Sequence, residues 1–170
     1  MTKLPDLLTV SRGALALAFV GLGFAGPGAL WVVVLLMMIG WTTDILDGRL
    51  ARRYNKDATW IGKHEFSFDM AMVFASLFYL VMAGFIPVTP TVIYSLVAGV
   101  CIVTFRSKSV TMLFAFPVVA LPLVIAYLNA PVAAWIYLAW IALALIADWR
   151  RFKGVVLEFI ANAKLLLQRR

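Results

Sequence analysis

Residues 44–69 read DILDGRLARRYNKDATWIGKHEFSFD, and this stretch decides how the rest of the chain is interpreted. It carries two pairs of carboxylates, Asp44 with Asp47 and Glu65 with Asp69. Side chains three or four residues apart share one face of a helix, so each pair presents its carboxylates together. Long apolar segments flank the stretch, and charges kept beside a bilayer are costly and mark functional sites. We therefore expect a site for hard divalent cations and for the phosphates that they carry.

The composition is that of a membrane protein. Of the 170 residues 64% are hydrophobic, whereas a soluble domain of this length is closer to half apolar. Because the excess lies in long runs, we expect an integral membrane protein with a single domain over residues 1–170. The net charge of +7 comes from basic residues at the ends of these runs. This arrangement favours contact with anionic lipid head groups, and we expect no nucleic acid partner.

The apolar runs predict membrane-spanning helices. Turn-forming residues such as Gly26, Pro87 and Pro131 separate them. The expected spans cover about 7–24, 30–51, 66–86, 90–106, 109–128 and 131–149. The sequence thus predicts an all-α integral membrane protein whose six transmembrane helices enclose a cytoplasm-facing polar cavity.

The basic residues predict the orientation of these spans. Every Lys and Arg falls on one side of the six-span arrangement, and the three loops on the other side carry no charge. By the positive-inside rule both termini and the carboxylate stretch face the cytoplasm, at the plasma membrane. Residues 150–170 alternate basic and apolar side chains at roughly helical spacing. They are interpreted either as a basic amphipathic helix on the cytoplasmic surface or as a solvated tail.

The stretch resembles the signature of the CDP-alcohol phosphotransferase family. That signature begins D-x2-D-G-x2-A-R, which is matched in full by Asp44, Asp47, Gly48, Ala51 and Arg52. It continues further along the chain as G-x3-D-x3-D. Here Glu65 stands at the third acidic position and Asp69 at the fourth, while Gly62 comes one residue later than the family's glycine. The exchange of Asp for Glu keeps the charge and adds one methylene.

The resemblance implies an enzyme that displaces CMP from a CDP-linked donor, usually CDP-diacylglycerol, with the hydroxyl of a small alcohol. By this analogy one or two Mg²⁺ or Mn²⁺ ions are held by Asp44, Asp47, Glu65 and Asp69. Asp69 also takes the proton of the hydroxyl as general base. The CDP moiety is bound by Asp44, Gly48, Ala51, Arg52 and Thr59. The resemblance further implies a homodimer in the lipid bilayer.

Two weaker features suggest the acceptor. Residues 4–12 read LPDLLTVSR and resemble the opening of the phosphatidylglycerophosphate synthases. Arg106 and Lys108 either bind a phosphate on the acceptor or serve only as a topology signal. We expect glycerol 3-phosphate first and inositol phosphate second. Arg12 lies low in the first span, where it either reaches the carboxylates, anchors a lipid phosphate or extends to the membrane surface.

Three other interpretations stay open from the sequence. The carboxylates could form a structural ion-pair network with Arg49, Arg52, Arg53 and Lys63. The chain could be a family member that binds CDP-lipid and metal without turnover. It could also be a small cation transporter, although transporter sites lie near the middle of the membrane rather than at its edge.

Overall fold

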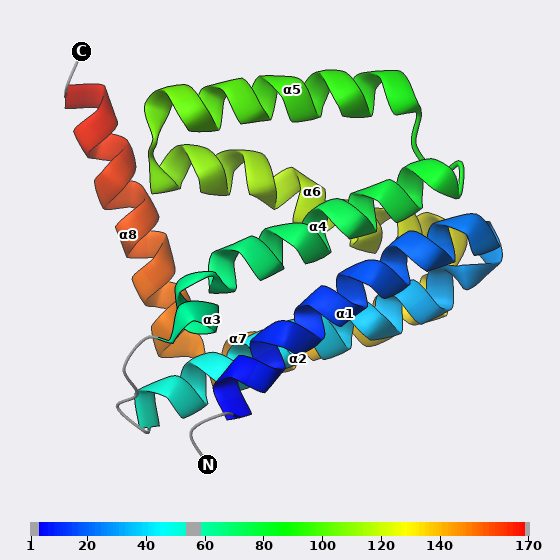
Figure 1. Cartoon of the computed structure of the whole chain (residues 1–170), viewed down its shortest axis with the longest axis horizontal. Helices are drawn as coiled ribbons and strands as arrows, with labels where there is room; N and C mark the ends of the chain where they lie inside the picture. Colours follow the sequence, from blue (N-terminus) through cyan, green and yellow to red (C-terminus); the bar gives the residue numbers. More distant parts are fainter. Residues whose placement is uncertain (1–3, 54–58, 169–170) are drawn as a thin grey trace.

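The computed structural model of the chain describes residues 4–53 and 59–168 (Figure 1). These residues form helices joined by short turns, and no strand occurs among them. In chain order the elements are α1 (Leu4–Ala25), the 3-10 helix η1 (Pro27–Ala29), α2 (Leu30–Arg53), α3 (Trp60–Lys63), α4 (Glu65–Met82), α5 (Val88–Phe105), α6 (Lys108–Asn129), α7 (Pro131–Ala147) and α8 (Trp149–Gln168).

Five of the helices, α1, α2, α4, α5 and α6, are long and apolar enough to cross a membrane. A sixth span is present if α7 is counted together with residues Phe152–Asn162 of α8, from which it is bent by 85°. The 17 residues of α7 alone extend roughly 25 Å, which is close to the hydrocarbon thickness of a bilayer. The predicted all-α membrane fold is confirmed.

One predicted span ends earlier than expected. α4 stops at Met82 rather than near residue 86. The reason is local: Gly84 has a φ of 77°, a left-handed conformation that glycine adopts without steric cost and that ends helices. The amides of Ala83 and Gly84 donate back to the last carbonyls of the helix.

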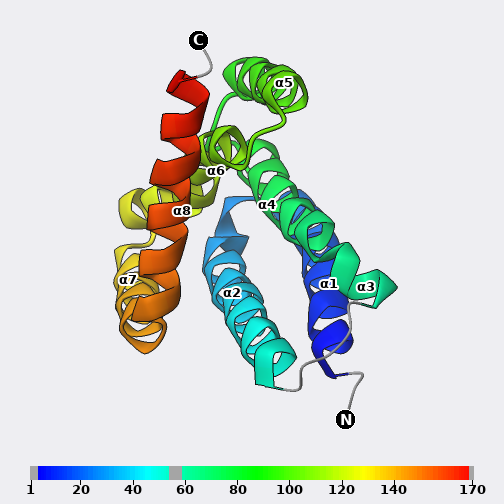
Figure 2. The same cartoon turned by 90° about the vertical axis from the view of Figure 1, so that its left-hand side faces the viewer.

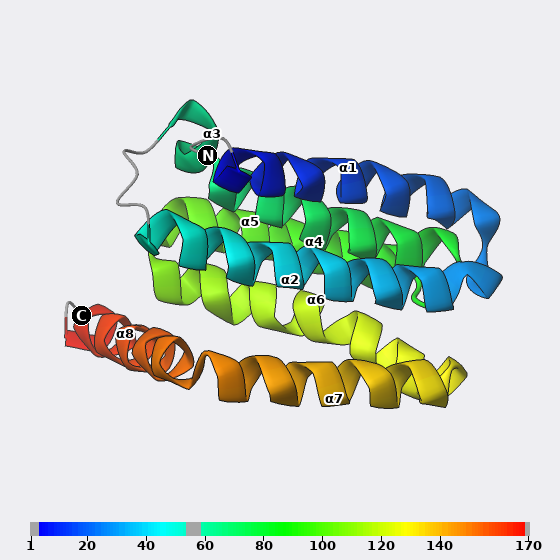
Figure 3. The same ribbon diagram turned by 90° about the horizontal axis from the view of Figure 1, so that it is seen from below.

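The helices run back and forth between two ends of the bundle (Figures 1 and 3). The turns after α1, α4 and α6 lie at one end, and they contain no charged residue. The start of α1, the end of α2, the start of α4 and the α5–α6 connection lie at the other end, which we call the polar end. Both pairs of carboxylates belong to the polar end, so the fold brings them to the same side of the molecule.

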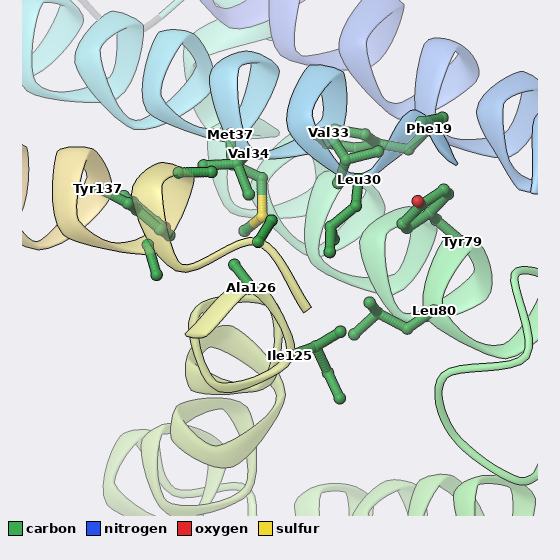
Figure 4. Close-up of a cluster of buried hydrophobic side chains, with 14 of the residues drawn as sticks. Phe19, Leu30, Val33, Val34, Met37, Tyr79, Leu80, Ile125, Ala126 and Tyr137 are labelled. Atoms are coloured by element: carbon green, nitrogen blue, oxygen red, sulfur yellow. The ribbon is translucent and has the colours of Figure 1, made fainter. Parts of the chain in front are cut away.

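The hydrophobic core lies where α1, α2, α4, α6 and α7 meet (Figure 4). Its fully buried side chains include Val33, Met37, Tyr79 and Ala126. The Tyr79 hydroxyl donates to the carbonyl of Gly26 at 3.3 Å and so ties α4 to the turn after α1. This core fixes how the helices are arranged, and thereby which side chains can meet at the polar end.

α1 packs along both α2 and α4 (Figure 2). Two glycines of α1 permit the close contact with α4. A Cβ atom added at Gly13 would lie 3.1 Å from the ring of Phe68, and one added at Gly23 would lie 3.2 Å from Cβ of Met82. Small residues allow membrane helices to approach this closely. The contact brings the polar end of α1 directly against the start of α4.

Candidate active site

Two helices supply the carboxylates of the site. α2 carries Asp44 and Asp47, and α4 carries Glu65 and Asp69. One oxygen from each of Asp44, Glu65 and Asp69 can be chosen so that all three lie within 4.8 Å of one another. Their side chains are 19%, 39% and 20% exposed, so a ligand can reach them. Three of the four carboxylates predicted from their spacing therefore form a single cluster, and the fourth, Asp47, lies beside it and is buried.

The side chain of Arg12, from α1, lies in the middle of this cluster and is completely buried. Its Nη1 donates to Oδ1 of Asp44 at 2.8 Å and also to Oδ1 of Asp69. Its Nη2 donates to Oδ2 of Asp47 at 2.8 Å and lies 3.9 Å from Oε1 of Glu65. A buried charge is stable only when it is paired, and Arg12 is paired with carboxylates from both helices.

Thr9 completes this arrangement from the preceding turn of α1. Its hydroxyl donates to Oδ2 of Asp47 at 2.6 Å and accepts a hydrogen bond from Nη2 of Arg12 at 3.2 Å. Thr9 and Arg12 are three residues apart, so they share one face of α1. The sequence left three possibilities for Arg12, and the first is correct: it reaches the carboxylates. The role of Thr9 was missed, although its spacing from Arg12 is a signal that could have indicated it.

This geometry agrees with the comparison to known families. The model of the CDP-alcohol phosphatidyltransferase family matches residues 2–161, which is nearly the whole chain. The chain belongs to this family. No curated protein and no solved structure matched it. The expected membership and the expected phosphotransferase activity are thereby confirmed, as is a CDP-alcohol as the substrate class.

The family signature also includes residues that were expected to bind CDP. Gly48 follows Asp47 on α2 and is partly exposed. Ala51 and Arg52 belong to the last turn of α2, but their side chains lie outside the described residues. Thr59 caps the N-terminus of α3, where its hydroxyl accepts a hydrogen bond from the Gly62 amide at 3.2 Å.

Thr59 contacts the start of α1. Its hydroxyl donates to Oδ1 of Asp6 at 2.7 Å, so Thr59 is tied to the first turns of α1. The short helix α3 also packs on α1. Thr59 therefore has a clear structural role at the entry to α4.

The basic residues expected to bind the acceptor lie between α5 and α6. Arg106 is exposed and ends α5 in a left-handed conformation, with a φ of 45°. Within the described part of the chain it makes no hydrogen bond or ion pair with the carboxylate cluster. Lys108 begins α6, and its side chain lies outside the described residues. The α5–α6 connection that carries them lies at the polar end of the bundle (Figure 1).

A cavity of about 550 Å³ adjoins the cluster on the side of Asp44. Side chains from α2, α6, α7 and α8 form its walls, and most of them are apolar or aromatic, such as Trp41, Tyr137 and Trp140. Asp148 forms part of the wall as well, and it pairs with Arg49 at 3.2 Å. The candidate site therefore combines a charged cluster with an adjacent, mainly apolar space.

Proposed function

We propose that this protein transfers a phosphatidyl group from CDP-diacylglycerol to the hydroxyl of a small alcohol and releases CMP. The observation that carries this proposal is the carboxylate cluster of Asp44, Glu65 and Asp69, built from both halves of the family signature. We propose glycerol 3-phosphate as the acceptor because residues 4–12 resemble the phosphatidylglycerophosphate synthases. Inositol phosphate is the second candidate.

The cluster suits a divalent metal ion. All of its donors are carboxylate oxygens, which hard ions such as Mg²⁺ and Mn²⁺ prefer, and they lie close enough to share one ion. Asp44, Glu65 and Asp69 would hold the ion, whereas Asp47, which the sequence predicted as a fourth ligand, is buried and hydrogen-bonded to Arg12 and Thr9. A bound ion neutralises the pyrophosphate and stabilises CMP as it leaves. Mg²⁺ and Mn²⁺ both satisfy these requirements.

The remaining chemistry can be assigned to residues of the chain. The acceptor oxygen forms a bond to the phosphorus that carries diacylglycerol, and the bond from this phosphorus to the oxygen of CMP breaks. The proton of the acceptor hydroxyl passes to the carboxylate of Asp69, which is partly exposed at the start of α4. Most of the remaining contribution to the reaction rate comes from positioning the donor and the acceptor, as in other phosphoryl transfers.

The donor has a polar and an apolar part, and we assign different regions to each. The residues proposed to contact CDP are those that the resemblance to the family implies, namely Asp44, Gly48, Ala51, Arg52 and Thr59. The cavity beside Asp44 suits the ester-linked end of diacylglycerol, because its walls include Trp41 and Trp140. Arg106 and Lys108 are proposed to attract a phosphate on the acceptor.

We further propose that the chain forms one domain, with its termini and its site facing the cytoplasm at the plasma membrane. The uncharged turns at the opposite end of the bundle support this orientation. α8 is strongly amphipathic and is proposed to lie on the cytoplasmic surface. We propose a homodimer within the bilayer, because the exposed apolar faces of α4 and α5 can contact a second copy of the chain.

The experiment that tests the function is CMP release by the purified protein in detergent. CDP-diacylglycerol and Mg²⁺ or Mn²⁺ are supplied with glycerol 3-phosphate, inositol phosphate, inositol, serine or choline, and Asp69→Asn serves as the blank. Release with one acceptor that is lost in Asp69→Asn supports the proposal and identifies the product. Absence of release with every acceptor, in protein that binds CDP-diacylglycerol, would indicate a family member without turnover and refute the proposal.

A further inference from the structure

Arg12 makes hydrogen bonds to the same carboxylates that the proposed metal ion requires. Two of the three residues of the metal cluster, Asp44 and Asp69, each accept a hydrogen bond from Nη1 of Arg12. We propose that Arg12 is a built-in competitor of the divalent ion: it holds the cluster together when no ion is bound and gives up Asp44 and Asp69 when one binds. This inference rests on the proposed function, because it requires the cluster to be a metal site.

The charges of the cluster explain why a resident cation is needed. Four carboxylates surround one guanidinium, and Coulomb repulsion between carboxylates this close is substantial in a partly buried site. Arg12 reduces this repulsion in the ion-free protein. A divalent ion at the same carboxylates would be repelled by the positive charge of Arg12. The guanidinium therefore stabilises the ion-free form and weakens the binding of the ion.

Arg12 can release its carboxylates only by changing its contacts. A guanidinium stays protonated under all ordinary conditions, so it has to change its contacts instead. Its two terminal nitrogens have different roles. Nη1 donates to Asp44 and Asp69, which belong to the metal cluster. Nη2 donates to Asp47 and Thr9, which do not, and it lies 3.9 Å from Glu65 of the cluster without a hydrogen bond to it. The Nη1 hydrogen bonds can therefore be exchanged for a metal ion while the Nη2 hydrogen bonds hold the guanidinium beside the cluster.

One hydrogen-bond donor of the Arg12 guanidinium is left unsatisfied by the residues that the structure describes. Its Nε is buried, and among the described residues it has no hydrogen-bond acceptor. A buried donor without a partner costs free energy, and the cost is larger for a charged group. A shift of the guanidinium when an ion and the phosphates of the donor arrive would give Nε access to acceptor oxygens. The unsatisfied Nε is thus consistent with a side chain that changes its contacts.

Binding of Mn²⁺, measured by the EPR signal of the free ion in detergent solution, tests this inference without any turnover. Arg12→Gln is expected to bind Mn²⁺ about tenfold more tightly than the unmodified protein, or tighter still, because one competing charge is removed. Arg12→Lys keeps the charge and loses the planar fork, so it should fall between the two. Unchanged or weaker binding by Arg12→Gln would overturn the inference.

The matched control is Arg49→Gln, which removes the same charge from an arginine that pairs with Asp148. Its Mn²⁺ affinity should change by less than about twofold, since an exposed charge is well screened. A tighter affinity in Arg49→Gln equal to that of Arg12→Gln would reduce the effect to net charge and overturn the inference. Absence of Mn²⁺ binding to the unmodified protein would instead refute the proposed metal site, and the inference with it.

Thermal unfolding with EDTA and with Mn²⁺ gives a second readout. The unmodified protein should be only slightly stabilised by Mn²⁺, because Arg12 already compensates the cluster. Arg12→Gln should unfold at a lower temperature in EDTA and be stabilised by Mn²⁺ much more strongly. If Arg12→Gln does not fold without the ion, it is prepared in Mn²⁺, and the same comparison is made with Arg12→Lys. Equal stabilisation of all three proteins by Mn²⁺ would contradict the proposed role of Arg12.

Discussion

Arg12 on α1 joins Asp44 on α2 to Asp69 on α4 through a single nitrogen atom, Nη1. The three helices are thereby linked at the polar end of the bundle, at the point where the family signature predicts the chemistry. The link depends on charge as well as on position, since Asp47 and Glu65 also lie within 4 Å of the guanidinium. This one side chain therefore connects the proposed metal ligands to the packing of three helices.

Asp47→Asn should destabilise the protein more than Asp69→Asn does. Asp47 is buried and accepts hydrogen bonds from both Arg12 and Thr9, whereas the Asp69 side chain is 20% exposed. Breaking a buried ion pair by removing one charge typically costs about 3–5 kcal/mol, and solvent reduces that cost for Asp69. Thermal unfolding of the two variants in the same detergent checks this order. Equal losses of stability would show that burial does not distinguish the two aspartates.

Thr9→Val should lower both stability and CMP release. The substitution keeps the shape of the side chain and removes the hydroxyl that donates to Asp47 at 2.6 Å. The expected loss is about 1–3 kcal/mol, because a buried carboxylate is left with one donor fewer. Thr42→Val is the matched control, since the Thr42 hydroxyl donates only to the carbonyl of Met38 in its own helix. A loss of the same size in the control would exclude a specific role for Thr9.

Much of the fold and the pairing of the carboxylates could be predicted from the sequence, because both depend on local periodicity. Apolar runs gave the spans to within a few residues, and the spacing of Asp44 and Asp47 gave a shared face. The contact of Arg12 with Asp69 joins residues 57 positions apart. It depends on how α1 packs against α4, and no local pattern contains that information.

The same limit applies to Thr59 and Arg106. Both were predicted to bind a ligand from their place along the chain, and that place does not give their contacts in space. Thr59 caps α3 and bonds Asp6, and Arg106 ends α5 in an exposed turn. Their proposed roles in binding therefore depend on contacts with a ligand, which the sequence alone does not determine.

Glu65→Asp should weaken Mn²⁺ binding and CMP release. The shorter side chain withdraws its carboxylate by about 1.5 Å, the length of one carbon–carbon bond. The oxygens of Asp44, Glu65 and Asp69 that form the cluster lie within 4.8 Å of one another, so a withdrawal of this size is a large fraction of their spacing. Mn²⁺ binding followed by EPR, together with CMP release, measures the effect. Tighter binding and faster release would show that an aspartate fits this position better.

Gly13→Val should separate α1 from α4 and reduce CMP release. A Cβ atom at this position would lie 3.1 Å from the ring of Phe68, which is adjacent to Asp69 in the sequence. The added branched side chain has to displace Phe68 or move α1, and either change disturbs the contact between Arg12 and Asp69. A loss of about 1–3 kcal/mol in stability, typical of overpacking, should accompany the lower rate.

Gly21→Val is the matched control for this prediction, because it lies in the same helix and an added Cβ would meet no atom within 4 Å. It should leave thermal unfolding and CMP release nearly unchanged. The double variant Gly13→Val/Phe68→Ala should recover part of the lost activity, since removing the ring creates space for the valine. If Gly13→Val behaves like Gly21→Val, then close packing of α1 on α4 is not what brings Arg12 to Asp69. If Phe68→Ala gives no recovery, the effect of Gly13→Val arises from the helix itself and not from the contact between the two helices.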